Sequence, residues 1–119
     1  DNYGVCKGES KLTFAGTSYI AKGSHGSKTR QNAKIMVFDL ASDASAKPIL
    51  KIDENDVEAS HGAVVGKIND EHMFYLTSRG LSFNDARSLI TMGYLKPILK
   101  GFFNEKYIEE ITSLIEGKL

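Results

Sequence analysis

The chain changes its pattern of apolar residues at Asn69, and this change limits the possible fold more than any other feature. Before Asn69, short runs rich in β-branched and aromatic residues are separated by Gly, Ser and Asp, which is typical of strands joined by turns. After Asn69, apolar residues recur with the period of an amphipathic helix. We therefore predict a β part over residues 1–68 and a helical part over residues 69–119.

The β part contains five β-prone runs that lie close together with no helical pattern between them. This arrangement excludes a βαβ architecture, which needs a helix between successive parallel strands. A small sandwich, a barrel and a parallel β-helix all fit the pattern, and composition does not choose among them. The predicted strands cover Lys11–Ala15, Thr17–Ala21, Ala33–Phe38, Pro48–Ile52 and Val57–Ile68.

The helical part shows three helices with recognisable ends. Asn69 is a suitable N-cap for the first, and Gly80 is suited to the position after its last residue, Arg79. Ser82 begins a second helix, whose pattern Pro97 interrupts near Leu95 because proline lacks an N–H and is tolerated only in a first turn. The sequence predicts a third helix from Asn104 to Gly117.

Composition excludes several classes of function. The formal net charge is zero, which argues against a nucleic-acid surface built on bulk positive charge. No apolar run approaches the roughly 18 residues that cross a bilayer, so we expect no membrane segment. The single Cys6 cannot form an internal disulfide, which fits a reducing cytoplasm. Because the chain begins at Asp1 without an initiator Met, we expect it to be processed or cut from a longer protein.

His61 is the strongest candidate for a functional residue. It lies in Ser60-His61-Gly62, where a glycine would let another group approach the backbone, and imidazole is a suitable ligand for iron, zinc or copper. A lone histidine in a strand is nevertheless commonly structural. Cys6 could supply a thiolate, but without a C-x-x-C spacing we interpret it as a small buried hydrophobic residue.

Two loops also carry polar groups. His25 lies in the glycine-rich basic segment Lys22–Arg30, which could hold an anion but lacks the P-loop spacing, so we interpret it as a solvated turn. The acidic segment Asp53–Glu58 fails the EF-hand pattern because Val57 occupies a ligand position and Glu58 stands where glycine is required. We interpret this segment as an acidic turn between strands.

Several segments, taken in order, resemble the SufB/SufD family of iron–sulfur cluster assembly scaffolds. The resemblance covers roughly residues 9–100 and is most specific from Asp56 to Gly80. The matching segments are Lys11–Gly16 ("S-x-x-x-F-x-G"), Gln31-Asn32 ("Y-Q-x-N"), Pro48–Ile52 ("P-x-L-x-I"), Asp56-Val57, Ser60–Ala63, Val65-Gly66, Phe74–Leu76, Ser78–Gly80 and Gly93-Tyr94.

Within the family, Ser60-His61-Gly62-Ala63 is similar to SufD, whereas SufB tends to carry Glu in an "H-E-A" run. The family's usual "D-A-Y-Q" is Lys28-Thr29-Arg30-Gln31 here, which indicates a divergent member. The resemblance implies a mainly β protein with α: a truncated right-handed parallel β-helix over 1–68 and a small C-terminal helical subdomain over 69–119. It also implies a C-terminal fragment of a cytoplasmic, non-catalytic scaffold.

The resemblance further implies partners and site residues. SufB would pair with the β-helix at His61, which is also the tentative metal ligand, and the ATPase SufC would dock on the helical subdomain. The expected SufC-docking residues are Phe83, Met92, Tyr94 and Leu95. We expect no cofactor bound stably by this chain, only a transient iron–sulfur cluster in the full complex. Uncovered strand edges lead us to expect that the chain self-associates.

Three alternatives differ from this interpretation. The first is a metal-dependent β-fold enzyme using His25, His61 and a carboxylate such as Asp53. The second is a plain interaction module in which His61 belongs to the core. The third is a SufB-type scaffold, against which the Ser60-His61-Gly62 run argues.

Overall fold

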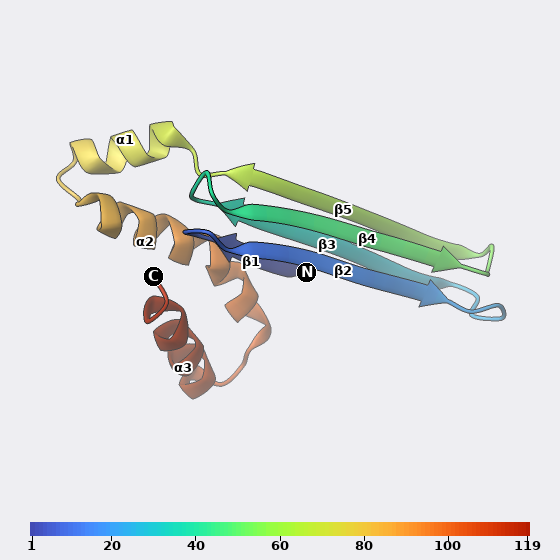
Figure 1. Cartoon of the computed structure of the whole chain (residues 1–119). Coiled ribbons are helices and arrows are strands. Elements are labelled where there is room, and N and C mark those ends of the chain that lie inside the picture. Colours follow the sequence, from blue (N-terminus) through green and yellow to red (C-terminus); the bar gives the residue numbers. More distant parts are fainter. The chain divides into compact units, whose positions relative to one another are not determined.

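A computed structural model describes all residues of the chain, 1–119 (Figure 1). The chain divides into two compact units, Asp1–Lys67 and Ile68–Leu119. The first unit holds all five strands and the second holds three α-helices and a short 3₁₀ helix. We describe each unit by itself.

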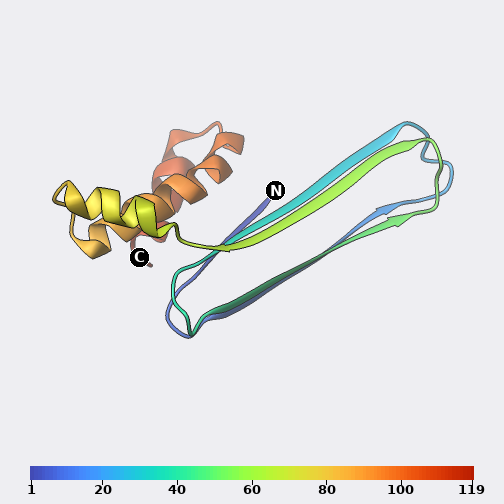
Figure 2. The same cartoon turned by 90° about the horizontal axis from the view of Figure 1, so that it is seen from above.

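The strands of the β unit form two parallel sheets, and neither sheet closes into a barrel. One sheet has three strands in the order β1-β3-β5, and the other has two, β2 and β4. The chain therefore passes from one sheet to the other at every turn, and Figure 2 shows the two sheets facing each other along their length. The strands are β1 (Asn2–Cys6), β2 (Lys11–Ile20), β3 (Ser27–Val37), β4 (Asp43–Ile52) and β5 (Val57–Lys67).

Neighbouring strands of a sheet pair without a slip, so equivalent residues of successive circuits are stacked. Bonded side chains on adjacent strands are 30 to 32 residues apart in sequence, as in the pair of Lys28 Nζ and Glu58 Oε1 at 2.6 Å and the pair of Thr13 and Ser45 hydroxyls at 3.0 Å. In a strand, alternate side chains face opposite sides. One side of each sheet therefore faces the other sheet, and the opposite side faces solvent.

The apolar core of the β unit lies between the two sheets. Cys6, Ile35 and Val37 are buried there, and Leu12, Phe14, Ala44 and Ala46 of the opposite sheet pack against them. Gly4 also faces this core, where a Cβ would lie 2.6 Å from Leu12 Cδ2. The sheets approach closely at this position because Gly4 has no side chain.

The structure has five strands, as many as the predicted runs, but their bounds differ and β2, β3 and β4 are longer. The runs on either side of Gly16 form one strand, β2, and the predicted five runs miss β1 altogether. Strand β3 begins at Ser27, within the segment Lys22–Arg30 interpreted above as a turn, and β4 begins at Asp43, outside any predicted strand. These segments are extended because residues of adjacent circuits pair with them, and such long-range pairing overrides local strand preference.

The helical unit confirms the predicted helix ends. Helix α1 (Asp70–Ser78) is capped by Asn69, whose side chain accepts from the N–H groups of Glu71 and His72, and Gly80 follows with a φ of 98°. Helix α2 (Phe83–Leu95) is capped by Ser82 and gives way to the 3₁₀ helix η1 (Lys96–Gly101), which holds Pro97 in its first turn. Helix α3 (Glu105–Glu116) begins after Asn104 and ends at Gly117.

Met73, Ala86, Thr91 and Leu99 are buried within the helical unit. None of the chain's helices combines the length and the apolar character needed to cross a membrane.

Candidate functional site at the open edge of the β unit

His61 lies in the middle of β5, which is an edge strand. Strand β5 pairs with β3 on one side, and no strand of this chain pairs with its other side. The His61 side chain is exposed and makes no hydrogen bond or ion pair. The predicted strand Val57–Ile68 is confirmed as β5, which runs from Val57 to Lys67. The imidazole therefore lies beside a row of unpaired backbone N–H and C=O groups.

The strand register places His61 on the side of its sheet that faces the other sheet. His61 is the register partner of Gln31, and partners in a parallel pair project from the same face. Gln31 extends between the sheets, since a Cβ on Gly16 of β2 would overlap Gln31 Nε2. The inner row of β5 is Val57, Ala59, His61, Ala63, Val65 and, at the end of the strand, Lys67. His61 is the polar residue in the middle of this row, with apolar residues on both sides.

The inner row of β5 is more exposed than the row beside it on β3. Ile35 is 1% exposed, whereas its register partner Val65 is 44% exposed. The difference arises because β3 has a strand on each side and β5 has one on a single side. The chain thus presents an apolar row that contains one imidazole at an uncovered edge.

Gly62 lies on the opposite face of β5 from His61 and pairs with Asn32. A Cβ at Gly62 would lie 3.5 Å from Asn32 Oδ1, which is an ordinary van der Waals contact. No group of this chain therefore requires the missing side chain at Gly62. The space predicted from Ser60-His61-Gly62 is present but unused within the chain.

His25 lies in the turn between β2 and β3 and contacts a carboxylate of the chain itself. Glu54 Oε2 accepts the Gly23 N–H at 2.8 Å, and Glu54 Oε1 lies 3.4 Å from His25 Nδ1. The Gly23 N–H, followed by the Asn55 N–H, holds the pKa of Glu54 below its ordinary value of 4.5. The anion that the glycine-rich loop contacts is therefore the Glu54 carboxylate of the adjacent turn. This contact joins the two turns.

The groups of the predicted metal-enzyme alternative are not assembled in this chain. Asp53 Oδ2 accepts the Tyr19 hydroxyl at 2.7 Å, a bond that raises the pKa of Tyr19. His25 contacts Glu54, whereas His61 has no such contact. No three side chains of His, Cys, Asp or Glu gather in an arrangement that could hold a metal ion. The acidic segment Asp53–Glu58 likewise forms no ligand cluster that could hold a calcium ion.

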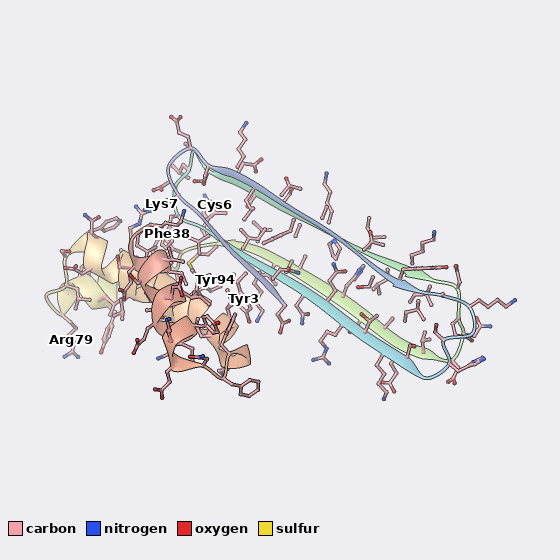
Figure 3. The ribbon with its side chains drawn as sticks, turned by 90° about the horizontal axis from the view of Figure 1, so that it is seen from below. Tyr3, Cys6, Lys7, Phe38, Arg79 and Tyr94 are labelled. Carbon is pink, nitrogen blue, oxygen red and sulfur yellow. The ribbon has the colours of Figure 1, made fainter.

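Cys6 belongs to the core, as the sequence predicts. Its side chain is 2% exposed and packs with Ile35 and Val37, and its Sγ lies 3.9 Å from the Asp43 carbonyl oxygen. Figure 3 shows Cys6 near Lys7 and Phe38 where β1 ends, and the Phe38 N–H donates to the Cys6 carbonyl at 2.9 Å. These contacts account for Cys6 without a reactive role.

The predicted docking residues of the helical unit differ in exposure. Phe83 is 59% exposed, whereas Met92, Tyr94 and Leu95 are half-buried, and Figure 3 labels Tyr94 on its helix. Leu89 of the same helix is 53% exposed. A groove of about 540 Å³ borders this helix and is lined by Leu81, Asp85, Ser88, Leu89, Met92, Glu116 and Leu119. Exposed apolar surface is therefore present on α2.

Gln31 stands out in the sequence only as part of a family motif. In the structure its carbonyl oxygen Oε1 is buried without a hydrogen-bond partner, next to His61 in the register. Only the pairing of strands 30 residues apart brings these two side chains to the same row. No local pattern in the sequence predicts that relation.

Comparison with known proteins identifies the family. Residues 1–94 match the profile described as "SUF system FeS cluster assembly, SufBD core domain". The chain is 32% identical over 117 residues to the iron–sulfur cluster assembly protein SufD of Bacillus subtilis, covering 98% of this chain and 27% of that protein. It is 29% identical over 115 residues to SufB of the same organism, covering 97% of this chain and 24% of that protein.

A SufBD family protein of Mycobacterium tuberculosis is 33% identical over 112 residues, which cover 94% of this chain and 13% of that protein. The chain thus spans about a quarter or less of the length of these curated relatives. Most of the chain, both units included, lies within the region of similarity. The chain belongs to the SufBD family of iron–sulfur cluster assembly proteins.

Proposed function

We propose that this chain is part of a SufD-like, non-catalytic scaffold that pairs with SufB and is coupled to the ATPase SufC. Membership of the SufBD family supports a role in iron–sulfur cluster assembly. The observation that carries the finer proposal is His61, an exposed imidazole without a partner on an edge strand. A residue in this position is available to a second protein.

The β unit is proposed to be the end of a right-handed parallel β-helix. Its chain alternates between two parallel sheets, and stacked residues recur every 30 to 32 positions, as expected for successive coils. Connections between parallel strands of one sheet are right-handed in about 98% of cases, which supports the hand. The parallel pairing favours this architecture over a sandwich of antiparallel hairpins.

SufB is proposed to bind along β5. The strand offers unpaired backbone groups over its 11 residues together with the apolar inner row of Val57, Ala59, Ala63 and Val65. A second strand can satisfy such an edge through main-chain hydrogen bonds. In the absence of SufB, the same edge favours self-association of the chain.

SufC is proposed to dock on the helical unit at Phe83, Met92, Tyr94 and Leu95. The support is the exposure of Phe83 and Leu89 on one helix, with Leu89 and Met92 lining a groove, since exposed apolar surface often marks a protein interface. The half-buried Met92 and Tyr94 would contribute at the border of that surface.

The Ser60-His61-Gly62 run supports a SufD-like scaffold over a SufB-type one, because SufB tends to carry Glu near this position, in an "H-E-A" run. Sequence identity does not separate the two, at 32% to SufD and 29% to SufB. His61 would supply one imidazole to an iron–sulfur cluster that is handed on as cargo. Mixed ligation by nitrogen and sulfur is known in iron–sulfur proteins and would suit a cluster that must be released.

The test is His61→Ala in the complete protein that carries this sequence, with His72→Ala as the control. Both histidines are exposed, so each change should alter the free energy of unfolding by less than about 0.5 kcal/mol. We expect His61→Ala to leave assembly with SufB and SufC intact and to reduce cluster formation in cells, while His72→Ala has no effect. Normal cluster formation, or loss of the folded protein, in His61→Ala would contradict the proposed role.

A further inference from the structure

Gln31 has a buried side-chain acceptor that nothing in the chain satisfies. Its Oε1 is buried and has no hydrogen-bond partner. Buried carbonyl oxygens are nearly always hydrogen-bonded, because removal from water without a replacement bond costs free energy. An exception of this kind in the interior calls for an explanation. Asn2, Thr17 and Lys47 line a cavity of about 200 Å³ together with Gln31, but none of them donates to Gln31 Oε1, and the Asn2 amide donates to the Asn32 carbonyl instead.

The amide of Gln31 is held in place by the opposite sheet. Its Nε2 lies where a side chain on Gly16 would otherwise be. Gly16 therefore permits the extended conformation of Gln31 across the space between the sheets. A larger residue at position 16 would force the amide to move.

His61 is the side-chain donor that stands opposite Gln31 on the adjacent strand β5. Gln31 and His61 are register partners, and the strands of a sheet are about 4.8 Å apart. Ala59 and Ala63 flank His61 on the same row and have no side-chain donor. On β3 itself, the next residues on this face are Thr29, two residues before Gln31, and Ala33, two residues after it.

We propose that Gln31 is a positioning residue for His61: Gln31 Oε1 accepts the N–H of one imidazole nitrogen and directs the other nitrogen toward the open edge of β5. The proposal rests on the function proposed above and deepens it. Histidines that bind metals usually donate their second N–H to a carbonyl or carboxylate, which fixes the tautomer and the ring orientation. Here the exposed imidazole can rotate to make that bond, since it makes no other.

The experiment is NMR of the imidazole nitrogens of this chain, with the exposed His72 as an internal reference. We expect His61 to favour one tautomer more strongly than His72 does. Gln31→Leu should abolish the preference, because leucine offers no acceptor. Gln31→Glu should retain it, because a carboxylate oxygen can accept the same imidazole N–H. Gly16→Ala, which displaces the amide while retaining Gln31, should weaken the tautomer preference.

Thr29→Val is the matched control, since Thr29 lies on the same face and pairs with Ala59 instead of His61. It should change the tautomer preference of His61 less than Gln31→Leu does. Equal effects of Thr29→Val and Gln31→Leu, or no response of His61 to Gln31→Leu or Gly16→Ala, would overturn the proposal. Cluster formation by His61→Ala in the complete protein tests the proposed function separately, because the NMR result concerns only the bond between the two side chains.

Discussion

Two glycines in the β unit should respond in opposite ways to alanine, and the difference measures how closely the sheets pack. A Cβ at Gly4 would lie 2.6 Å from Leu12 Cδ2, closer than real Cβ contacts, and 3.1 Å from Phe14 Cε2, closer than most of them. A Cβ at Gly62 would meet only Asn32 Oδ1, at 3.5 Å. Neither glycine has a positive φ, so alanine can adopt both backbone conformations.

The expected magnitudes follow from two opposing terms. Alanine in place of glycine lowers the entropy of the unfolded chain, which stabilises the fold by about 0.4–1 kcal/mol where space allows. Overpacking a core costs about 1–3 kcal/mol. Leu12 and Phe14 pack against the buried cluster of Cys6, Ile35 and Val37, so they cannot move away without losing contacts. Gly4→Ala should therefore destabilise by about 1–2 kcal/mol, and Gly62→Ala should stabilise by about 0.5 kcal/mol.

Urea unfolding of the chain, followed by circular dichroism, measures both changes. The unfolding midpoint should fall for Gly4→Ala and rise slightly for Gly62→Ala, with the dependence on urea concentration unchanged. A Gly4→Ala variant as stable as the parent would refute the close packing at β1. In the complete protein, a stable Gly62→Ala variant that no longer binds SufB would show that a partner group occupies the space beside Gly62.

Two further predictions concern the turn carboxylate and the helical surface. The Gly23 and Asn55 N–H groups lower the pKa of Glu54, so its contribution to stability is present above about pH 4.5 and is lost as the pH falls through the lower folded-state pKa. Glu54→Gln should thus lower the Tm near neutral pH and flatten the acid side of the Tm–pH profile, and an unchanged profile would contradict this. Phe83→Glu with Leu89→Glu should weaken SufC binding at least tenfold in a pull-down titration while SufB pairing is retained. Phe74→Glu, on a more exposed aromatic residue of α1, is the control, and equal SufC affinity in all variants would refute the docking assignment.

The helix ends could be predicted from the sequence because their causes are local. Asn69, Ser82 and Asn104 cap the helices that follow them, and each accepts hydrogen bonds from residues two or three positions later. Pro97 likewise marks the change from α2 to η1 within one turn. Such interactions need no information about distant parts of the chain.

The strand ends could not be predicted as well, because their causes are distant. The segment from Asp43 to Lys47 contains small and polar residues, and it is a strand because it pairs in register with Lys11–Ala15. The segment from Ser27 to Asn32 is similar, since its partners are Val57–Gly62. The sequence shows the alternation of apolar and polar residues within a strand. It does not show how many residues make one circuit of the two sheets, and that number decides which residues are stacked.

The candidate site shows the same division between local and distant information. The chemistry of imidazole and the family motif draw attention to His61, whereas its exposure depends on β5 being the last strand of its sheet. The proposed role of Gln31 depends on two contacts that the sequence does not show, its pairing with His61 and its close approach to Gly16. Both relations join residues that belong to different circuits of the chain.

The proposed site would be completed by a second protein. A cluster is usually held by several thiolate or imidazole ligands, and His61 is the one such group on the open face of β5, since Cys6 is committed to the core. A SufB strand added to β5 would place its own side chains beside the inner row, because strands paired in a sheet alternate in the same way. Gln31 would hold the His61 ring toward that added strand, so cluster ligation and partner binding would depend on the same edge.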